Sequence, residues 1–298
     1  MSLKTKEEYF SDAKVLIEAL PYIKKFKDKI IVIKYGGSAM TDDAVKAEVI
    51  RDVALMKLVG MNPVVVHGGG NEISSMLSRL GIESRFEDGL RVTDKETVDV
   101  VQMVLAGKIN KEIVSLFQME GMNAAGICGH DGRTFSVDKH MPNGKDIGYV
   151  GDVSHVNTGL IDALISNDFI PVIAPVGTDE NGNSYNINAD FAAAAVAEAL
   201  GAEKLIFMSD VEGVYGSDGN MINRIKTDHI EAMIEEKVIT GGMIPKLNCC
   251  KEATDAGVKS VHIIDGRVVH SLLLEIFTNY GIGTMIYSDL YEEVNHAE

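Results

Sequence analysis

Residues 30–38 read IIVIKYGGS, a short apolar run that ends in a lysine and two glycines. Similar runs follow, and most of them end in a glycine-rich or polar turn; they occupy residues 63–67 (PVVVH), 169–176 (FIPVIAPV), 204–208 (KLIFM) and 261–264 (VHII). Each run is continuously apolar rather than alternating, which is typical of strands covered on both faces in a parallel sheet. The sequence therefore predicts a buried, mainly parallel sheet.

Helical stretches separate these strands, at residues 42–59, 71–80, 95–119, 158–167, 190–200, 227–238, 244–256 and 270–278. This alternation predicts a doubly wound α/β fold whose ligands bind at the carboxyl ends of the strands. Residues 84–94 and 134–153 predict two inserted hairpins, which are candidate lids. The composition changes at residues 177–183 (GTDENGN), which indicates a hinge between two lobes.

The composition narrows the class of protein. The 298 residues carry 28 Lys and Arg against 44 Asp and Glu, a formal net charge of −16, so we expect neither nucleic acid nor a membrane as a partner. Three cysteines, Cys128, Cys249 and Cys250, argue against a disulfide framework and for a reducing compartment. The N-terminus has no apolar signal region and no run approaches 18 apolar residues, so we expect a cytoplasmic protein.

The first 29 residues precede the first strand and contain an amphipathic pattern. Tyr9, Ala13, Leu16, Leu20 and Ile23 recur at spacings of three and four, which predicts a helix with one apolar stripe. The stripe could pack on its own subunit or against another chain. The spacing alone leaves both alternatives open.

Two glycine-rich strand ends are candidate anion sites. Lys34, Gly36 and Gly37 precede a helix, so their backbone N–H groups and the lysine could form a phosphate nest, although a structural turn explains the pattern equally well. Residues 67–71 (HGGGN) hold three consecutive glycines, whose cost in backbone entropy favours an anion cradle over a tight turn. We expect His67 to be a structural hydrogen-bonding group rather than a base.

Polar residues elsewhere are further candidates for binding a ligand. The planar guanidinium of Arg91 suits a carboxylate, although an isolated exposed arginine is usually solvated surface. Asn186, Asn188 and Asp190 would share one face of an extended segment and form a polar wall. For Asp190 alone, capping the following helix is the simpler interpretation.

Two later turns are candidate nucleotide-binding segments. Residues 209–215 (SDVEGVY) follow a buried strand and could wrap a base or a ribose, or simply turn. Residues 241–246 (GGMIPK) place two glycines, a first-turn proline and Lys246 at the start of a helix. Such a helix start predicts another anion site.

In their order and spacing, seven motifs over residues 30–290 resemble those of the amino-acid kinase family. They are KYGG from Lys34, HGGGN from His67, GLRVT from Gly89, GYVGD from Gly148, NINAD from Asn186, SDVEG from Ser209 and GMIPK from Gly242. The resemblance implies a three-layer αβα sandwich with a mainly parallel open sheet. It also implies an oligomerisation and regulation helix (1–29), an N-lobe for acceptor binding and dimerisation (30–178) and a C-lobe for ATP and arginine (179–298).

The same resemblance implies a reaction. The branch of the family that fits best transfers a phosphoryl group from ATP, carried with Mg²⁺, to the γ-carboxylate of N-acetyl-L-glutamate, giving N-acetyl-L-glutamyl 5-phosphate in the second step of arginine biosynthesis. A carboxylate is already ionised at pH 7, so this reaction needs no general base. The main obstacle is repulsion between two anions, which lysines and oriented N–H groups would reduce.

Residue by residue, the resemblance implies four groups of contacts. Lys34 and Lys246 would neutralise the transferring phosphoryl group, and Asp190 would hold the two lysines in place. The acceptor would be bound by Gly69, Gly70, Arg91 and Asn186. The nucleotide would be bound by Gly36, Gly37, Ser209, Asp210, Tyr215, Gly242 and Met243, and Mg²⁺ would sit on the phosphates without a dedicated protein site.

The N-terminal helix and residues 270–284 resemble the arginine-sensitive branch of the family. This implies a homo-hexamer built as a trimer of dimers and inhibited by L-arginine, with effector contacts from His270, Glu275, Gly281 and Gly283. Binding of a PII-type signalling protein stays open. Two alternatives also stay open: a kinase of N-acetyl-aminoadipate in lysine biosynthesis, and a catalytically silent amino-acid sensor on the same fold.

Overall fold

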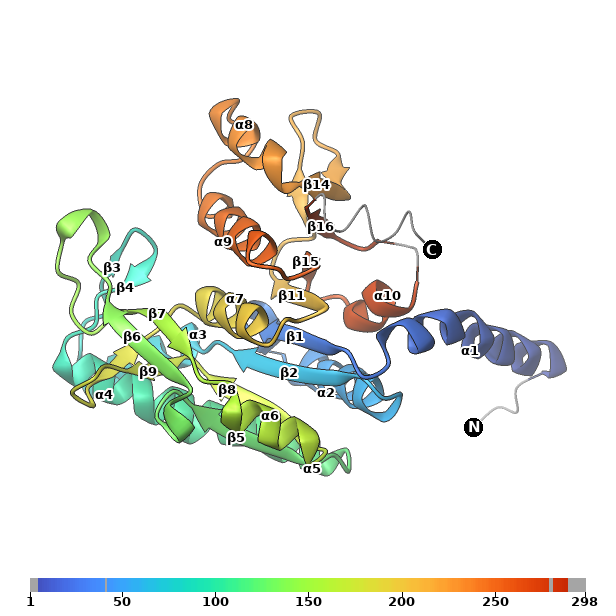
Figure 1. The fold of residues 1–298 in the computed structure, drawn as a ribbon, viewed down its shortest axis with the longest axis horizontal. Helices are drawn as coiled ribbons and strands as arrows, with labels where there is room; N and C mark the ends of the chain where they lie inside the picture. Colours follow the sequence, from blue (N-terminus) through green and yellow to red (C-terminus); the bar gives the residue numbers. More distant parts are fainter. Residues whose placement is uncertain (1–4, 41, 279–280, 289–298) are drawn as a thin grey trace.

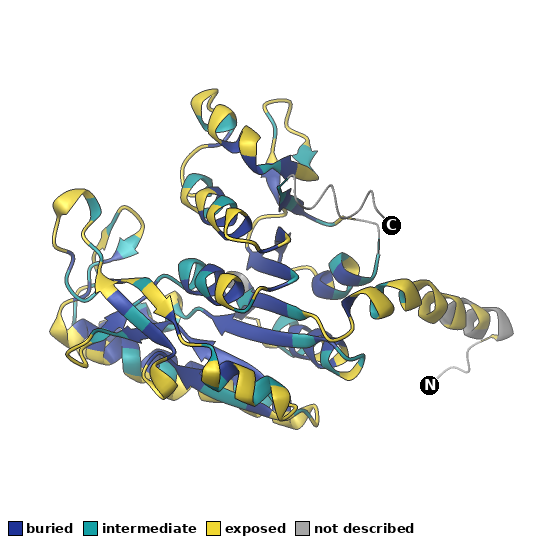
Figure 2. Cartoon of the chain, viewed as in Figure 1, coloured by how far each residue is buried: buried dark blue, intermediate teal, exposed yellow. Residues whose placement is uncertain are grey.

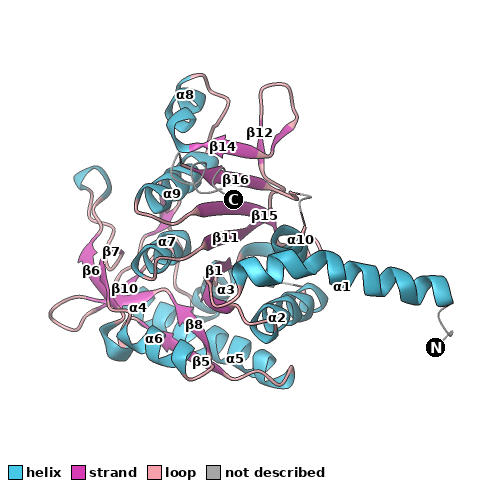
Figure 3. Cartoon of the chain, turned by 45° about the vertical axis from the view of Figure 1, so that its right-hand side comes forward, coloured by secondary structure: helices cyan, strands magenta, loops and turns pink. Residues whose placement is uncertain are grey.

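The computed structural model describes residues 5–40, 42–278 and 281–288, and its centre is one eight-stranded sheet in the order β14-β16-β15-β11-β1-β2-β8-β5 (Figures 1 and 3). Its strands are β1 (Ile30–Tyr35), β2 (Asn62–His67), β5 (Ala124–Cys128), β8 (Ile170–Ala174), β11 (Lys204–Ser209), β14 (Arg224–Lys226), β15 (Ser260–Asp265) and β16 (Thr284–Tyr287). Within the described residues, neighbouring strands of this large sheet are all parallel except β15 and β16. The expected mainly parallel sheet is confirmed.

Helices cover both faces of this sheet. They are α2 (Asp43–Leu58), α3 (Gly70–Leu80), α4 (Lys95–Gln102), α5 (Asn110–Met119), α6 (Gly159–Ser166), α7 (Ala189–Ala199), α8 (Ile230–Glu235), α9 (Met243–Asp255) and α10 (Ser271–Phe277). Side chains alternate between the two faces of a strand. Ile31 and Ile33 of β1 pack in a core with α2, α3, α5 and α10, whereas Val32 packs in a second core with α6, α7 and α9. The three-layer αβα sandwich is confirmed.

Three expected elements differ from those observed. The helix over 95–119 is continuous but contains a π-helical segment, η2 (Met103–Ile109), between α4 and α5. The strand over 169–176 breaks at Pro175 into β8 and a separate strand, β9 (Val176–Thr178), which belongs to another sheet. The helix over 227–238 is shorter, because it begins with the 3₁₀ turn η5 (Thr227–His229) and α8 stops before Lys237, whose φ is +59°.

The structure also contains smaller sheets and short helical turns outside the large sheet. A four-stranded sheet has the order β10-β9-β6-β7. Its remaining strands are β6 (Phe135–Lys139), β7 (Gly151–Val156) and β10 (Ser184–Asn186), and the other short elements are β12 (Val214–Tyr215), β13 (Met221–Ile222), η1 (Gly37–Met40), η3 (Asp131–Arg133) and η4 (Pro142–Gly144). The antiparallel pair β6–β7 confirms the hairpin expected over 134–153.

The second expected hairpin is also present, as β3 (Phe86–Glu87) and β4 (Leu90–Arg91). Asp88 and Gly89, between these strands, both have positive φ, at +48° and +81°. Positive φ at both central residues is the geometry of a tight two-residue hairpin turn, and Asp-Gly is a preferred sequence for it.

The segment expected as a hinge, residues 177–183, forms the end of β9 and the turn into β10. The large sheet takes β1, β2, β5 and β8 from the expected N-lobe and β11, β14, β15 and β16 from the expected C-lobe. The division of the chain at residue 178 therefore stays a prediction. Its outermost ranges also include residues 1–4 and 289–298, which lie outside the described part of the chain.

The N-terminal helix α1 (Lys6–Phe26) extends from one side of the sandwich (Figure 1), and most of its surface is exposed (Figure 2). Leu16, Ile17 and Leu20 of its apolar stripe are exposed by 72%, 69% and 42%. At its C-terminal end Phe26 is buried against the body of the protein. Over the described residues, no helix has both the length and the apolar character needed to cross a membrane.

Candidate active site

Two lysines meet on one carboxylate at the carboxyl ends of the central strands. Lys34, the next-to-last residue of β1, places its Nζ 3.0 Å from Asp190 Oδ1, and Lys246, in the first turn of α9, places its Nζ 2.6 Å from Asp190 Oδ2. Both lysine side chains are largely buried. The Lys246 ammonium also lies 5.2 Å from the centroid of the Phe207 ring, which adds a cation–π contact. The sequence motifs for these three groups therefore converge in space.

Asp190 is ionised in this arrangement. Burial alone would raise its pKa, but the charges of Lys34 and Lys246 and their hydrogen bonds lower the pKa of Asp190 to about 2. The carboxylate does not cap its helix. Asn188 is the N-cap residue of α7, and its side chain accepts a hydrogen bond from the Asp190 N–H at 2.8 Å. The capping interpretation of Asp190 is thus wrong, and its side chain is left for the two lysines.

A cavity of about 270 Å³ opens beside the lysines. Its walls come from the ends of β1 and β2, the β3–β4 hairpin and the start of α7. Among the residues expected at the site, it is lined by Lys34, Gly37, Gly69, Gly70, Arg91, Asn186 and Asp190. The cavity therefore combines the expected acceptor residues with one lysine and the carboxylate.

The HGGGN segment forms one wall of this cavity through Gly68, Gly69 and Gly70. Gly69 is the N-cap residue of α3, and a Cβ atom there would lie 2.3 Å from Ile109 Cδ1 and 2.6 Å from Leu105 Cδ2. A side chain at position 69 would therefore force Ile109 and Leu105 to shift. His67 is fully buried, and burial lowers the pKa of its ring to about 4, so it is neutral and structural, as expected from the sequence.

Arg91 is not the solvated residue that its hairpin position would suggest. It is buried, and its guanidinium donates to Gly70 O at 2.9 Å, to Ser74 Oγ at 2.9 Å and to Ser84 Oγ. A guanidinium has five N–H donors; with three used, two are not engaged by the described residues. Burial lowers the pKa of Arg91 without discharging it. The ring of Phe86 packs 4.7 Å from the guanidinium carbon.

Asn186 also lines this cavity. Its backbone N–H donates to Tyr149 O at 2.9 Å, and its side-chain amide donates to Thr93 Oγ1 at 3.4 Å. Thr93 and Tyr149 come from the two predicted hairpins, residues 84–94 and 134–153, which are joined here because the Tyr149 N–H donates to Thr93 O. The amide is therefore held at the cavity by segments that are distant in sequence.

The residues expected at the nucleotide lie along the same edge of the sheet. Ser209 ends β11, which pairs with β1, so it lies beside Gly36 and Gly37 at the carboxyl ends of the two strands. Gly37 has φ of +66° and begins η1. Two members of this group follow on neighbouring elements: Asp210 accepts a hydrogen bond from Ser209 Oγ at 3.5 Å, and Tyr215 in β12 is exposed and donates to Glu212 Oε2 at 2.5 Å.

Gly242 and Met243 form the start of α9, one turn before Lys246.

The described residues include no group of three His, Cys, Asp or Glu side chains that could hold a metal ion. The three cysteines are free thiols and all are buried.

A second cavity, of about 480 Å³, lies where the end of α1 meets β15, β16 and α10. Three of the four residues expected at an effector site line it: Glu275, Gly281 and Gly283. Two residues missed from the sequence stand beside them. The buried Lys204 ammonium donates to His262 Nε2 at 2.8 Å, and His262 Nδ1 donates to Glu275 Oε1 at 2.7 Å. The sequence did offer a signal for them, because Lys204 and His262 are polar residues within otherwise apolar strands.

His270 does not line this second cavity. Its left-handed backbone, with φ of +61°, turns the ring toward α2, where its Nδ1 lies 2.7 Å from Asp52 Oδ1 and its Nε2 lies 3.7 Å from Glu48 Oε2. The expected effector contact from His270 is therefore not seen in this arrangement. The ring instead joins α10 to α2.

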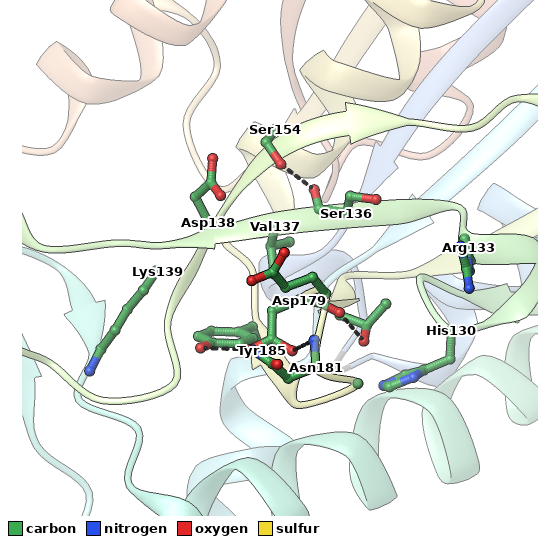
Figure 4. Close-up of a pocket in the computed structure, with 13 residues that line it drawn as sticks. His130, Arg133, Ser136, Val137, Asp138, Lys139, Ser154, Asp179, Asn181 and Tyr185 are labelled. Carbon is green, nitrogen blue, oxygen red and sulfur yellow. Dashed lines mark hydrogen bonds between the residues drawn. The ribbon is translucent and has the colours of Figure 1, made fainter.

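A larger cavity, of about 680 Å³, lies on the four-stranded sheet (Figure 4). His130, Arg133, Asp138, Lys139 and Tyr185 are among its lining residues. None of the residues expected at the active site lines it. Its mixed charges do not reproduce the paired lysines and glycine cradle of the smaller cavity.

Comparison with known proteins agrees with this geometry. The Amino acid kinase family model matches residues 29–265. The acetylglutamate kinase of Caldanaerobacter subterraneus subsp. tengcongensis is 54% identical over 297 residues, covering 97% of this chain and 99% of its own, and that of Thermoanaerobacter pseudethanolicus is 54% identical over 286 residues, covering 95% of each.

Among solved structures, N-acetylglutamate synthase from Neisseria gonorrhoeae, complexed with coenzyme A and N-acetyl-glutamate, is similar with a TM-score of 0.83. The match covers 92% of this chain and 63% of that chain at 23% identity, so it concerns the fold alone. The sequence relatives go further, because they match over nearly the full length of both partners. The chain belongs to the amino acid kinase family and, within it, to the acetylglutamate kinases.

Proposed function

We propose that this chain transfers the γ-phosphoryl group of ATP to the γ-carboxylate of N-acetyl-L-glutamate, giving N-acetyl-L-glutamyl 5-phosphate and ADP. The observation that carries the proposal is the convergence of Lys34 and Lys246 on Asp190 beside a cavity walled by glycines and Arg91. Two ammonium groups held at one point offset the charge that builds up when two anions react.

Each part of the cavity has a role in this reaction. The unused N–H donors of Arg91 and the amide of Asn186 would hold the carboxylate and amide groups of the acceptor. Lys34 and Lys246 would contact the transferring phosphoryl group, and Asp190 would keep both ammonium groups in place. The attacking γ-carboxylate is ionised at neutral pH, so no proton has to be removed.

The nucleotide would lie across the ends of β1 and β11, with Gly36 and Gly37 donating N–H groups to its phosphates and Ser209, Asp210, Tyr215, Gly242 and Met243 lining the remainder of its site. The described residues offer no carboxylate cluster of their own for a divalent ion. Mg²⁺ would therefore be carried on the phosphates, where it would neutralise charge when bound.

The test measures ATP-dependent formation of the acyl phosphate, trapped with hydroxylamine, for N-acetyl-L-glutamate and for N-acetyl-aminoadipate. We expect kcat/KM to favour the shorter acid. Lys34→Ala and Lys246→Ala should each lower kcat by ~10²-fold or more, as expected when one charge-stabilising donor is lost. The matched control is Lys251→Ala, which removes a lysine of the same helix that pairs with Glu231 and Asp255.

Three results would contradict the proposal. Equal turnover in the Lys246→Ala and Lys251→Ala variants would remove the lysine pair from the reaction. A preference for N-acetyl-aminoadipate would assign the chain to the lysine-pathway reaction. No ATP consumption with either acid would favour a silent sensor.

We further propose that L-arginine binds the second cavity and inhibits the enzyme. Glu275 is an anion inside this cavity: burial tends to raise its pKa, but the His262 hydrogen bond and the nearby charge of Lys204 hold the pKa of Glu275 below its usual value. A guanidinium suits such a carboxylate. Lys204 and Arg224, also in the lining, supply positive charge for the carboxylate of arginine.

The position of the cavity supports a link to assembly. Tyr22, Lys25 and Phe26 of α1 form part of its lining. The preceding turns of α1 expose Leu16, Ile17 and Leu20, an apolar surface that a second copy of the helix would cover. A homo-hexamer, in which α1 joins dimers, would place the effector at the base of the helix that holds the assembly together.

A further inference from the structure

A fully buried polar chain lies directly behind the glycine wall of the acceptor cavity. Asn110 and His67 have no exposed surface. His67 Nδ1 lies 2.8 Å from Gly68 O, and His67 Nε2 lies 3.2 Å from Asn110 Nδ2. The chain therefore connects the first residue of α5 to the first glycine of the cavity wall.

The hydrogen-bonding partners allow only one arrangement of protons. A carbonyl oxygen can only accept, so His67 Nδ1 must carry the hydrogen that it donates to Gly68 O. Its Nε2 then accepts from the Asn110 amide, which also donates to Val172 O at 2.9 Å and, at 3.4 Å, to Ile127 O, while Asn110 Oδ1 accepts from Lys111 Nζ at 3.0 Å. Because burial lowers the pKa of His67 to about 4, the ring stays neutral and keeps this tautomer at working pH.

The tautomer sets the direction of a backbone donor in the cavity. The Gly68–Gly69 peptide is trans, so its N–H points away from its carbonyl oxygen. Holding Gly68 O toward His67 therefore directs the Gly69 N–H away from His67. Within the described residues this N–H has no hydrogen-bonding partner, and Gly69 lines the cavity.

The π-helical segment η2 packs closely against Gly69 of the same peptide. Leu105 and Ile109, both in η2, approach Gly69 so closely that a Cβ atom there would displace them. Asn110 follows immediately as the first residue of α5. The extra residue in a π-helical turn shifts the following side chains around the helix axis. The segment thus supplies both the packing against Gly69 and the amide that orients His67.

We propose that Asn110 and His67 are positioning residues for the acceptor: they hold the Gly68–Gly69 peptide so that the Gly69 N–H is aimed at an anionic oxygen of the bound acid. This inference rests on the proposed function, which places the acceptor in this cavity. Neither residue touches the reacting atoms. Their loss should weaken binding of the acceptor and leave the nucleotide unaffected.

The decisive comparison uses two substitutions of His67. An asparagine amide at this position can replace the Nδ1 donor, whereas a glutamine amide reaches the position of Nε2. His67→Asn should keep KM for N-acetyl-L-glutamate within about threefold of the wild-type value, and His67→Gln should raise it by about tenfold, the effect of one lost hydrogen bond. KM for ATP should stay unchanged in both variants.

A second pair of variants tests the packing without removing a polar group. Gly69→Ala should raise KM for the acceptor, because its Cβ would overlap Ile109 Cδ1. Adding Ile109→Val, which deletes that methyl group, should recover a substantial part of the loss. Thr254→Val is the control for general damage, because Thr254 is buried in α9 and its hydroxyl donates to Cys250 O of the same helix.

The outcomes separate this inference from the function beneath it. If the wild-type enzyme neither binds nor phosphorylates N-acetyl-L-glutamate, the proposed function fails and the inference fails with it. If the wild-type enzyme is active but His67→Asn and His67→Gln behave alike, or KM for ATP rises as much as KM for the acceptor, only the inference is overturned. The same holds if Ile109→Val gives no recovery in Gly69→Ala.

Discussion

Asp190 shows how one carboxylate can hold two ammonium groups together. Its two oxygens each hold one ammonium group, so neither lysine has to be fixed by a separate anchor. The pKa of about 2 keeps Asp190 charged throughout the range in which the enzyme would work. The negative charge of Asp190 offsets the repulsion between the two ammonium groups before any substrate binds, so the two lysine side chains can stay close together.

Arg91 gives a prediction that separates acceptor from nucleotide binding. Arg91→Ala should raise KM for N-acetyl-L-glutamate by at least about tenfold, because a charged hydrogen bond is lost, while KM for ATP changes little. The measurement is steady-state kinetics with each substrate varied in turn. Arg85→Ala is the matched control, since Arg85 lies in the same hairpin but is exposed. An unchanged acceptor KM in Arg91→Ala would place this arginine outside the site.

The sequence predicts which residue types meet here, but not how they are held. The resemblance carried by KYGG, NINAD and GMIPK implied that Lys34 and Lys246 meet at Asp190, and the structure brings these three side chains together. The partners of Arg91 were not accessible, because Ser74 and Ser84 carry no pattern of their own and meet it only in three dimensions. The direction of the His270 ring was not accessible for a similar reason: its left-handed backbone, which decides where the ring points, cannot be read from the sequence.

At the scale of elements, the strongest strands were predictable and the weakest were not. β1, β2 and β11 are uninterrupted apolar runs and were recognised. β5 (Ala124–Cys128) reads AAGIC, which has little intrinsic strand preference; its place is fixed by pairing with β8 and by packing. The π-helical segment was also missed, because a local change in helical pitch leaves the apolar pattern of residues 95–119 nearly intact.

The contact between α2 and α10 predicts an unusual dependence of stability on pH. Asp52 in α2 is buried beside His270, and one of its oxygens has no hydrogen-bonding partner among the described residues. Burial raises the pKa of Asp52 to about 6, with the His270 hydrogen bond opposing part of the rise. The folded protein therefore holds this proton more tightly than the unfolded chain, so the contribution of Asp52 to stability falls as pH rises from about 4 to 6.

Asp52→Asn removes this titration. The melting temperature of the variant relative to wild type should increase as pH rises through that range, measured by thermal unfolding at fixed ionic strength. Asp43→Asn, in the first turn of the same helix, is the control: Asp43 is exposed and its hydrogen bond to Lys46 lowers its pKa, so it titrates below this window. A constant difference between Asp52→Asn and wild type across pH 4–6.5 would contradict the assignment.

At the scale of the whole molecule, the surface to be explained is the exposed apolar stripe of α1, formed by Leu16, Ile17 and Leu20. The helix leaves the body of the sandwich, and its exposed stripe ends where Tyr22 and Phe26 reach the second cavity. The same helix therefore has two separable parts. Its first turns would carry the contact between dimers, and its last turn would carry part of the effector site.

A truncation can separate these two parts. Removing residues 1–20 deletes Leu16, Ile17 and Leu20 but keeps the cavity residues from Tyr22 onward, with Pro21 as a suitable first helical residue. We expect light scattering to show dimers instead of hexamers, with activity on N-acetyl-L-glutamate retained because the active site lies at the far end of the strands. Glu18→Gln is the control, since Glu18 is exposed on α1 and pairs with Lys14 at 3.5 Å.

The matching effector variant is Glu275→Gln, which removes the carboxylate from the second cavity without touching the exposed stripe. It should remain a hexamer and lose inhibition by L-arginine, with the half-inhibitory concentration raised by about tenfold or more, as expected for a lost charged hydrogen bond. L-arginine should also inhibit the truncated chain only weakly, because arginine bound at the base of α1 can affect another subunit only if α1 contacts that subunit. A hexamer that survives removal of residues 1–20 would show that α1 does not join the dimers, and inhibition that survives Glu275→Gln would move the effector to a different site.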